Sequence, residues 1–157
     1  MEGASYMSKI NVQLGVESDI EILTQFNLSM AMETEHLQLN YDIVLSGIDS
    51  VMKDKSLGFY LIAELDNEIA GSLLITYEWS DWRNGLFWWI QSVYVKPQFR
   101  RSGIYKNLYY HVKQLSKAYT NLRGFRLYVE ENNHLAQMAY ESLGMHATHY
   151  KLYEEIL

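Results

Sequence analysis

The stretch of sequence that decides the fold is Val93-Tyr94-Val95-Lys96-Pro97-Gln98-Phe99-Arg100-Arg101-Ser102-Gly103-Ile104-Tyr105. It begins as an apolar strand, which Pro97 ends because proline has no backbone N–H to continue a ladder. A basic loop follows, and Gly103 opens a helix with apolar residues on one face. A helix start presents unpaired N–H groups and the positive end of the helix dipole. With Arg101 and Lys106 beside it, the stretch predicts a cradle for a pyrophosphate.

The charge distribution around this stretch also favours an anion site. The chain has 13 Lys and Arg residues against 19 Asp and Glu residues, which gives a net charge of -6. Eight of the basic residues and none of the acidic ones lie between Lys96 and Arg126. The alternative is a solvated basic helix without a ligand. The remaining surface is strongly acidic, which favours cationic partners and disfavours nucleic acid.

Length and composition set the class of protein. The chain has 157 residues, 48% of them hydrophobic and 20% charged, as in an ordinary globular domain, so we expect one domain over residues 1–157. The absence of cysteine excludes disulfides, thiolate metal sites and a cysteine nucleophile. We find no apolar run long enough for a membrane span and no signal peptide pattern. We therefore expect a cytoplasmic protein without membrane contact.

Hydrophobic periodicity predicts an α/β (α+β) domain. Period-2 patterns and apolar runs predict strands over residues 10–16, 59–65, 69–77, 86–95, 125–129 and 146–153, the first with one buried face. Helices are expected from a capping box at Ser18 and Glu21 through Met30, over 41–53, from Gly103 onward, and over 135–143. Two late strand–helix crossovers predict a parallel pair of strands in an otherwise antiparallel sheet.

The stretch around Gly103 resembles the acyl-CoA-binding motif of the GNAT N-acetyltransferase superfamily, which reads Arg/Gln-x-x-Gly-x-Gly/Ala after a strand. Arg100 and Gly103 match this motif, whereas Tyr105 stands where the family usually has Gly or Ala. A second match lies downstream, where Asn133 is followed by Tyr140 and by the run 143–145, Leu-Gly-Met. The two motifs and the order of elements together identify the chain as similar to this family.

The resemblance implies a GNAT-like single domain in which the strand over 86–95 carries a bulge and splays from its parallel neighbour. Acetyl-CoA would lie in the gap, its pantetheine arm against the backbone of 93–95 and its pyrophosphate on the amides of 101–106. An N–H of the splayed strand would polarise the thioester carbonyl. The cofactor-binding residues implied are Val93, Tyr94, Val95, Arg100, Arg101, Ser102, Gly103, Ile104, Tyr105, Lys106 and Asn133.

The resemblance also assigns a catalytic residue. Tyr140 corresponds to the tyrosine that gives a proton to the departing CoA thiolate. The alternative for Tyr140 is a core aromatic of an amphipathic helix, and Asn133 can also serve as a helix cap. The amine would attack the thioester directly, without a covalent enzyme intermediate and without a metal.

The general base stays open in the sequence. Relatives often place a glutamate where this chain has Gln91 or Tyr128, and neither side chain can serve as a base. The remaining candidates, each also readable as a solvated surface group, are Glu33, Glu35, His36, Glu78 and Asp81.

The loop over residues 77–85 is the expected acceptor site. Its two tryptophans and two carboxylates suit a cation through charge pairing and cation–π contact, although such loops also occur as simple turn packing. The substrate-binding residues expected are Glu33, Glu78, Asp81, Trp82 and Gln91.

Three functions remain open at this point. The leading hypothesis is N-acetylation of a small, cationic amine such as a polyamine, an amino acid or an amine-bearing toxin. The alternatives are a protein lysine or N-terminal acetyltransferase and a degenerate acyl-CoA-binding regulatory module. Dimers are common in the family, so the resemblance allows a homodimer.

Overall fold

The computed structural model describes residues 9–157, whose strands form one mixed sheet. The strands, in their order across the sheet, are β1 (Asn11–Leu14), β2 (Phe59–Leu65), β3 (Glu68–Ser80), β4 (Gly85–Val95) and β5 (Leu122–Arg126). All neighbours are antiparallel except β4 and β5, which are parallel. The expected mostly antiparallel sheet with one parallel pair is therefore confirmed.

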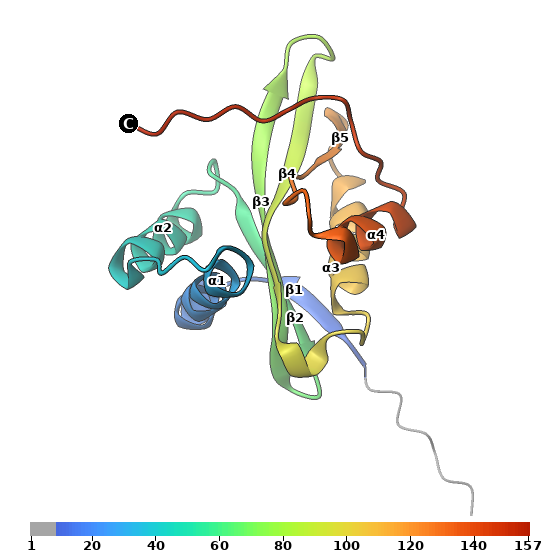
Figure 1. Ribbon diagram of the computed structural model, residues 1–157. Coiled ribbons are helices and arrows are strands. Elements are labelled where there is room, and N and C mark those ends of the chain that lie inside the picture. Colours follow the sequence, from blue (N-terminus) through green and yellow to red (C-terminus); the bar gives the residue numbers. More distant parts are fainter. Residues whose placement is uncertain (1–8) are drawn as a thin grey trace, which may run out of the picture. The chain divides into compact units, whose positions relative to one another are not determined.

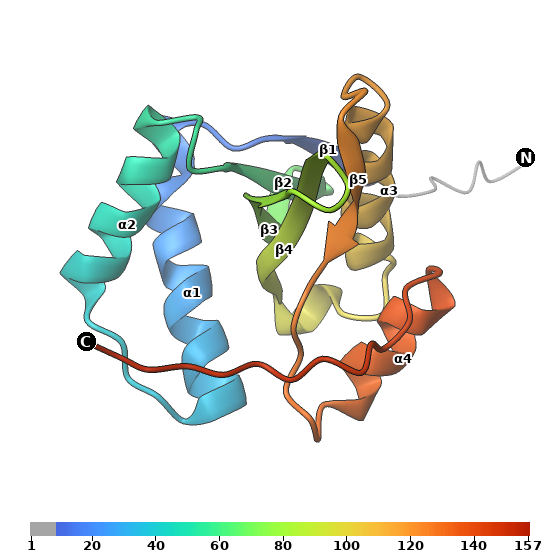
Figure 2. The ribbon, with the colours of Figure 1, turned by 90° about the horizontal axis from the view of Figure 1, so that it is seen from above.

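The described α-helices are α1 (Ile20–Glu35), α2 (Tyr41–Lys53), α3 (Ile104–Ser116) and α4 (His134–Ser142), and the first three cover the faces of this sheet. Figures 1 and 2 show α1 and α2 on one face of the sheet and α3 on the other. Within the described part of the chain, no helix has the length and apolar character that a membrane crossing requires.

The chain divides into two compact units, the first ending at Leu127 and the second spanning Tyr128–Leu157. The first unit contains the sheet and α1 to α3. The second contains α4, which begins after Asn133 because the side chain of Asn133 accepts a hydrogen bond from the Ala136 N–H at 3.2 Å. The expected role of Asn133 as a helix cap is thus confirmed.

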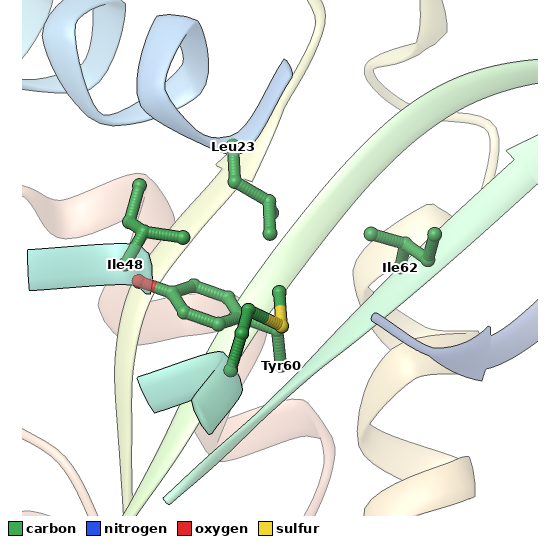
Figure 3. Packing of buried hydrophobic residues seen from close by; sticks show 5 residues of the cluster. Leu23, Ile48, Tyr60 and Ile62 are labelled. Carbon is green, nitrogen blue, oxygen red and sulfur yellow. The ribbon is translucent and has the colours of Figure 1, made fainter. Parts of the chain in front are cut away.

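The core on the α1 and α2 face is built from side chains of α1, α2 and β2. Leu23, Ile48, Tyr60 and Ile62 meet there, together with Met52 (Figure 3). Burial of such apolar side chains stabilises the fold by roughly 1.5–3 kcal/mol each. Because Tyr60 pairs with Leu74 across β2 and β3, the even-numbered residues of β3 from Ser72 onward share this face.

Strands β4 and β5 separate part-way along their length. Their register joins Leu86–Trp89 to Leu122–Arg126 and stops at the pair Trp89 and Arg126. Beyond this point β4 carries a bulge, since two of its residues lie between the partners of Ser72 and Leu74, and Ser92 has a φ of 49°. The splayed, bulged strand that the resemblance implied is present. We call the point of separation the fork.

The N-terminal elements differ from the prediction. Strand β1 is short, and Leu14 and Val16 are exposed, so the expected buried face does not form. The predicted capping box at Ser18 is wrong, because α1 follows a short 3-10 helix at Glu17–Asp19. Asp19 supplies the side-chain contact instead, its carboxylate accepting the Val16 N–H at 2.8 Å. This back-reaching bond is of the kind predicted for Glu21, and it caps the 3-10 helix, whereas Asp19 makes no side-chain cap bond to α1 itself.

Three strand predictions also need correction. Strand β3 continues to Ser80 because its hairpin pairing with β4 extends to Gly85. Strand β5 begins at Leu122 rather than 125, since the Leu86 N–H donates to the Asn121 carbonyl and places Leu122 beside Leu86. The strand predicted over 146–153 is absent. Its apolar residues Tyr150 and Tyr153 are exposed, so this segment buries no face that would hold it against a sheet.

Candidate functional site

The loop before α3 forms an open cradle for an anion. Gly103 has a φ of 80° and Arg101 a φ of 65°, so the chain turns sharply before the helix begins at Ile104. A Cβ atom on Gly103 would make ordinary contacts with the Asn107 Nδ2 at 3.7 Å and the Ile10 Cδ1 at 4.0 Å and would meet no clash beside the helix start. The first N–H groups of α3 have no intrahelical acceptor. The cradle therefore fits a phosphate group that approaches the backbone closely.

Arg100, at the start of this loop, ties it to α1. Its Nη2 donates to the Glu33 carboxylate at 2.5 Å, and its Nε donates to the Val95 carbonyl at 3.0 Å. The Tyr94 hydroxyl donates to the same carboxylate at 3.1 Å. Burial and the hydrogen bond to Glu33 raise the pKa of Tyr94, which keeps this phenol protonated as a donor. Glu33, expected to bind substrate, is thus ion-paired with a residue expected to bind cofactor.

The fork exposes one edge of β4. Among residues 9–157, no strand pairs with the β5-facing edge of β4 beyond Trp89. Backbone N–H and C=O groups over 90–95 can therefore pair with an extended ligand instead of a strand. This is the edge that Val93, Tyr94 and Val95 contribute.

Three polar side chains meet at the fork. The Glu78 carboxylate on β3 accepts a hydrogen bond from the Arg126 guanidinium at the end of β5 and another from the Trp89 indole at 3.2 Å. Both charged side chains are about one-third exposed, at 35% for Arg126 and 38% for Glu78. Glu78 therefore lies in an ion pair that spans β4.

An aromatic ring and a further polar pair complete this part of the sheet. The Arg126 guanidinium carbon lies 3.8 Å from the centroid of the Phe87 ring, and that of Arg83 lies 5.4 Å away. Gln91 donates to the Thr76 hydroxyl at 2.5 Å, one residue pair further along the same face. This bond holds the Gln91 side chain, which extends from β4, against β3.

The residues of the expected acceptor loop divide between the two faces of β3 and the turn that follows it. Glu78 and Trp79 are successive residues of β3, so their side chains point to opposite faces of the sheet. Asp81 lies in the turn, where its carboxylate accepts the N–H of Trp82 at 2.9 Å, and the Trp82 side chain is 84% exposed.

The second unit holds the residue expected to act as an acid. Tyr140 lies on α4, seven residues after the cap at Asn133. Burial raises the pKa of the Tyr140 phenol, so it carries its proton throughout the neutral range. A protonated phenol is the state that a proton donor requires.

The comparisons with known proteins settle the family. The model of the Acetyltransferase (GNAT) family matches residues 23–145 and so includes part of both units. The chain belongs to the GNAT acetyltransferase family. The donor used by this family is acetyl-CoA. Among curated proteins none matches the chain.

Solved structures show the same fold. A possible acetyltransferase from Clostridium difficile 630 is 37% identical, with a TM-score of 0.86, and the match covers 94% of this chain and 97% of that one. A predicted acetyltransferase from Clostridium acetobutylicum, solved with acetyl-CoA, is 19% identical with a TM-score of 0.77, covering 94% and 96%. An aminoglycoside N-acetyltransferase in complex with CoA is 16% identical with a TM-score of 0.74, covering 98% and 99%.

Sequence reasoning missed Arg126 at this acetyltransferase's fork. Arg126 entered the prediction as the last residue of a basic segment and as part of the strand over 125–129, without a functional role, because no motif marks it. Its carboxylate partner lies 48 residues away in sequence. A signal did exist, since two parallel strands were expected, and parallel pairing brings Arg126 beside Trp89. The strand was expected to begin at 125 and not at Leu122, however, and strand ranges alone do not determine the register.

Proposed function

We propose that this GNAT acetyltransferase transfers an acetyl group from acetyl-CoA to a primary amine of a small acceptor. The observation that carries the proposal is the combination of the open cradle at Gly103 with the unpaired edge of β4 beyond the fork. The cradle suits the phosphates of the donor, and the β4 edge suits its extended arm. Both features belong to the first unit.

The donor, when bound, supplies a thioester that an amine can acylate. The N–H groups over 101–106 would hold the pyrophosphate, with the positive end of α3 and Lys106 adding attraction. The backbone of Val93–Val95 would orient the arm as an added strand. Arg100 would act through the loop, which its bonds to Val95 and Glu33 keep in place.

The transfer itself requires two proton movements. The neutral amine nitrogen forms the new C–N bond as the C–S bond breaks, and the sulfur leaves with the bonding electrons. Tyr140 would give its proton to this sulfur. The nitrogen becomes cationic as the C–N bond forms and gives up one proton to water or to a carboxylate. At pH 7 an alkyl amine of pKa about 10.4 is almost wholly protonated, so a further proton must leave the ammonium group before attack.

The arginine pairing changes the expected character of the acceptor. Glu33 is paired with Arg100 and Glu78 with Arg126, so neither carboxylate offers an isolated negative charge to a polycation. The proposal therefore keeps the amine as the reacting group of the acceptor and does not require a second positive charge on it.

A thiol-release assay tests the proposal. The protein is mixed with acetyl-CoA and with polyamines, amino acids, an aminoglycoside or lysine-containing peptides, and CoA release is compared with an amine-free control. We expect release with small amines above the control. Release only with peptides would indicate a protein acetyltransferase. Binding of acetyl-CoA without any amine-dependent release would indicate a regulatory module and contradict the proposal.

A further inference from the structure

The ion pair at the fork places both signs of charge on one face of the sheet. Glu78, Phe87, Trp89 and Arg126 lie on the α1 and α2 face of the sheet, because they share the alternation that begins at Leu74. The register of β4 and β5 ends at Trp89 and Arg126. The ion pair of Glu78 and Arg126 therefore lies where β4 and β5 separate.

The Phe87 ring orients the Arg126 guanidinium, and some N–H groups of this guanidinium remain available to a ligand. Its guanidinium lies over the Phe87 ring, and this ring is held close to β5, since a Cβ on Gly124 would come within 3.0 Å of it. Of the five guanidinium N–H groups, those that bond to described residues go to Glu78 alone. The remaining N–H donors of the planar guanidinium group are of the kind that binds both oxygens of a carboxylate.

The nearby Arg123 has a structural role, in contrast to Arg126. Its guanidinium donates to three backbone carbonyls, those of Arg83 and Asn84 at 2.9 Å and of Thr120 at 3.1 Å. These bonds join the β3–β4 turn to the start of β5 and use most of its donors. Arg126 makes no bond to a backbone carbonyl among the described residues.

Glu78 also keeps capacity for a ligand. One carboxylate oxygen accepts from Arg126 and the other from Trp89, and each carboxylate oxygen can accept a further hydrogen bond. An ammonium group could therefore bind to Glu78 while a carboxylate binds to Arg126. With Arg83 and Arg126 both near Phe87, a polycation would meet repulsion at the same place.

We infer that Arg126 and Glu78 form the acceptor site and that the acceptor is a small zwitterion, an amine that also carries a carboxylate. Glu78 holds the amine near the fork, and Arg126 binds the carboxylate and so selects amino acids over amines of the same shape. This inference rests on the proposed function, since the fork is where that function places the transfer.

Matched acceptors test the inference. Steady-state rates are measured with the common amino acids, and for each acetylated one with its carboxamide and its decarboxylated amine. Loss of a charge-assisted hydrogen bond should lower kcat/KM by roughly 10- to 100-fold for both derivatives. Equal or faster acetylation of the derivatives would overturn the inference while leaving the proposed function intact. Absence of thiol release with every amine would instead mean that the proposed function has failed.

Arg126→Gln provides the second arm. It should raise KM for the amino acid about 10- to 100-fold, leave KM for acetyl-CoA unchanged and abolish the preference over the carboxamide. Arg83→Gln is the matched control, because it removes the same charge beside Phe87 from an arginine that has no carboxylate partner within residues 9–157. Arg126→Lys, which keeps the charge, should retain part of the preference and serves if the glutamine variant does not fold. Equal effects of Arg83→Gln and Arg126→Gln, or an unchanged preference in both Arg126 variants, would overturn the inference.

Discussion

Tyr140 combines a position on α4 with burial that raises the pKa of its phenol. If it gives a proton to the departing thiolate, Tyr140→Phe keeps the ring and its packing but removes the donor. We expect kcat to fall by about 10²- to 10⁴-fold, with KM for acetyl-CoA nearly unchanged. Tyr153→Phe is the matched control, since it removes a hydroxyl from an exposed tyrosine of the same unit.

The pH dependence of kcat is an independent test of the role of Tyr140. The active form is protonated, and burial raises its pKa above the ordinary value of about 10. Activity that depends on this proton should persist as the pH rises and decline only above about pH 10. A Tyr140→Phe enzyme with wild-type kcat would show that the phenol has no role in transfer, and a variant that fails to fold would favour the core-aromatic interpretation.

At the scale of elements, the decisive feature is the turn that starts α3. Gly103 and Gly144 both have positive φ values, and a Cβ at either would meet no clash, with contacts of 3.7 Å or more at Gly103 and none within 4 Å at Gly144. Substituting alanine therefore strains both backbones by a similar amount, about 1–2 kcal/mol. Only Gly103→Ala places a methyl group beside the N–H groups assigned to the pyrophosphate. We expect it to weaken acetyl-CoA binding at least tenfold, measured by calorimetry, while Gly144→Ala binds as the wild type does.

This comparison separates the cradle from general destabilisation. If Gly103→Ala and Gly144→Ala show the same affinity for acetyl-CoA, the phosphates bind elsewhere, and the motif around Gly103 serves only to turn the chain. Thermal unfolding of both variants shows whether the strain is indeed alike.

Across the whole molecule, burial raises the pKa of several tyrosines, among them Tyr60, Tyr77 and Tyr109. The unfolded chain, with tyrosine pKa values near 10, releases these protons first as the pH rises. The folded state then holds more protons than the unfolded state, so the free energy of unfolding decreases with increasing pH. We expect it to be constant with respect to these groups up to about pH 9 and to fall above pH 10.

Urea unfolding between pH 7 and 11 measures this dependence. Tyr60→Phe removes one of the contributing groups, and its decline above pH 10 should be shallower than that of the wild type. A free energy of unfolding that stays level to pH 11 would contradict the prediction.

Local signals in the sequence determined much of the first unit. Helix α2 and strand β2 have the predicted bounds, Tyr41–Lys53 and Phe59–Leu65, because their apolar patterns and end residues are unambiguous. The start of α3 follows from Gly103, whose positive φ few other residues adopt at low cost. The family resemblance at Arg100 and Gly103 likewise depends on residues that are close together in the sequence. The comparisons confirm the family.

Tertiary structure alone decided the contacts of the fork and of the loop before α3. The bond from Arg126 to Glu78 joins residues 48 apart, and that from Arg100 to Glu33 joins residues 67 apart. Local periodicity predicts which face a side chain takes within its strand, but the partner across a sheet depends on register. Register in turn depends on bulges, turn lengths and where each strand begins, and β3 and β5 both differed from prediction there. Carboxylates that the sequence presents as open charges are therefore neutralised by arginines that only the assembled sheet brings to them.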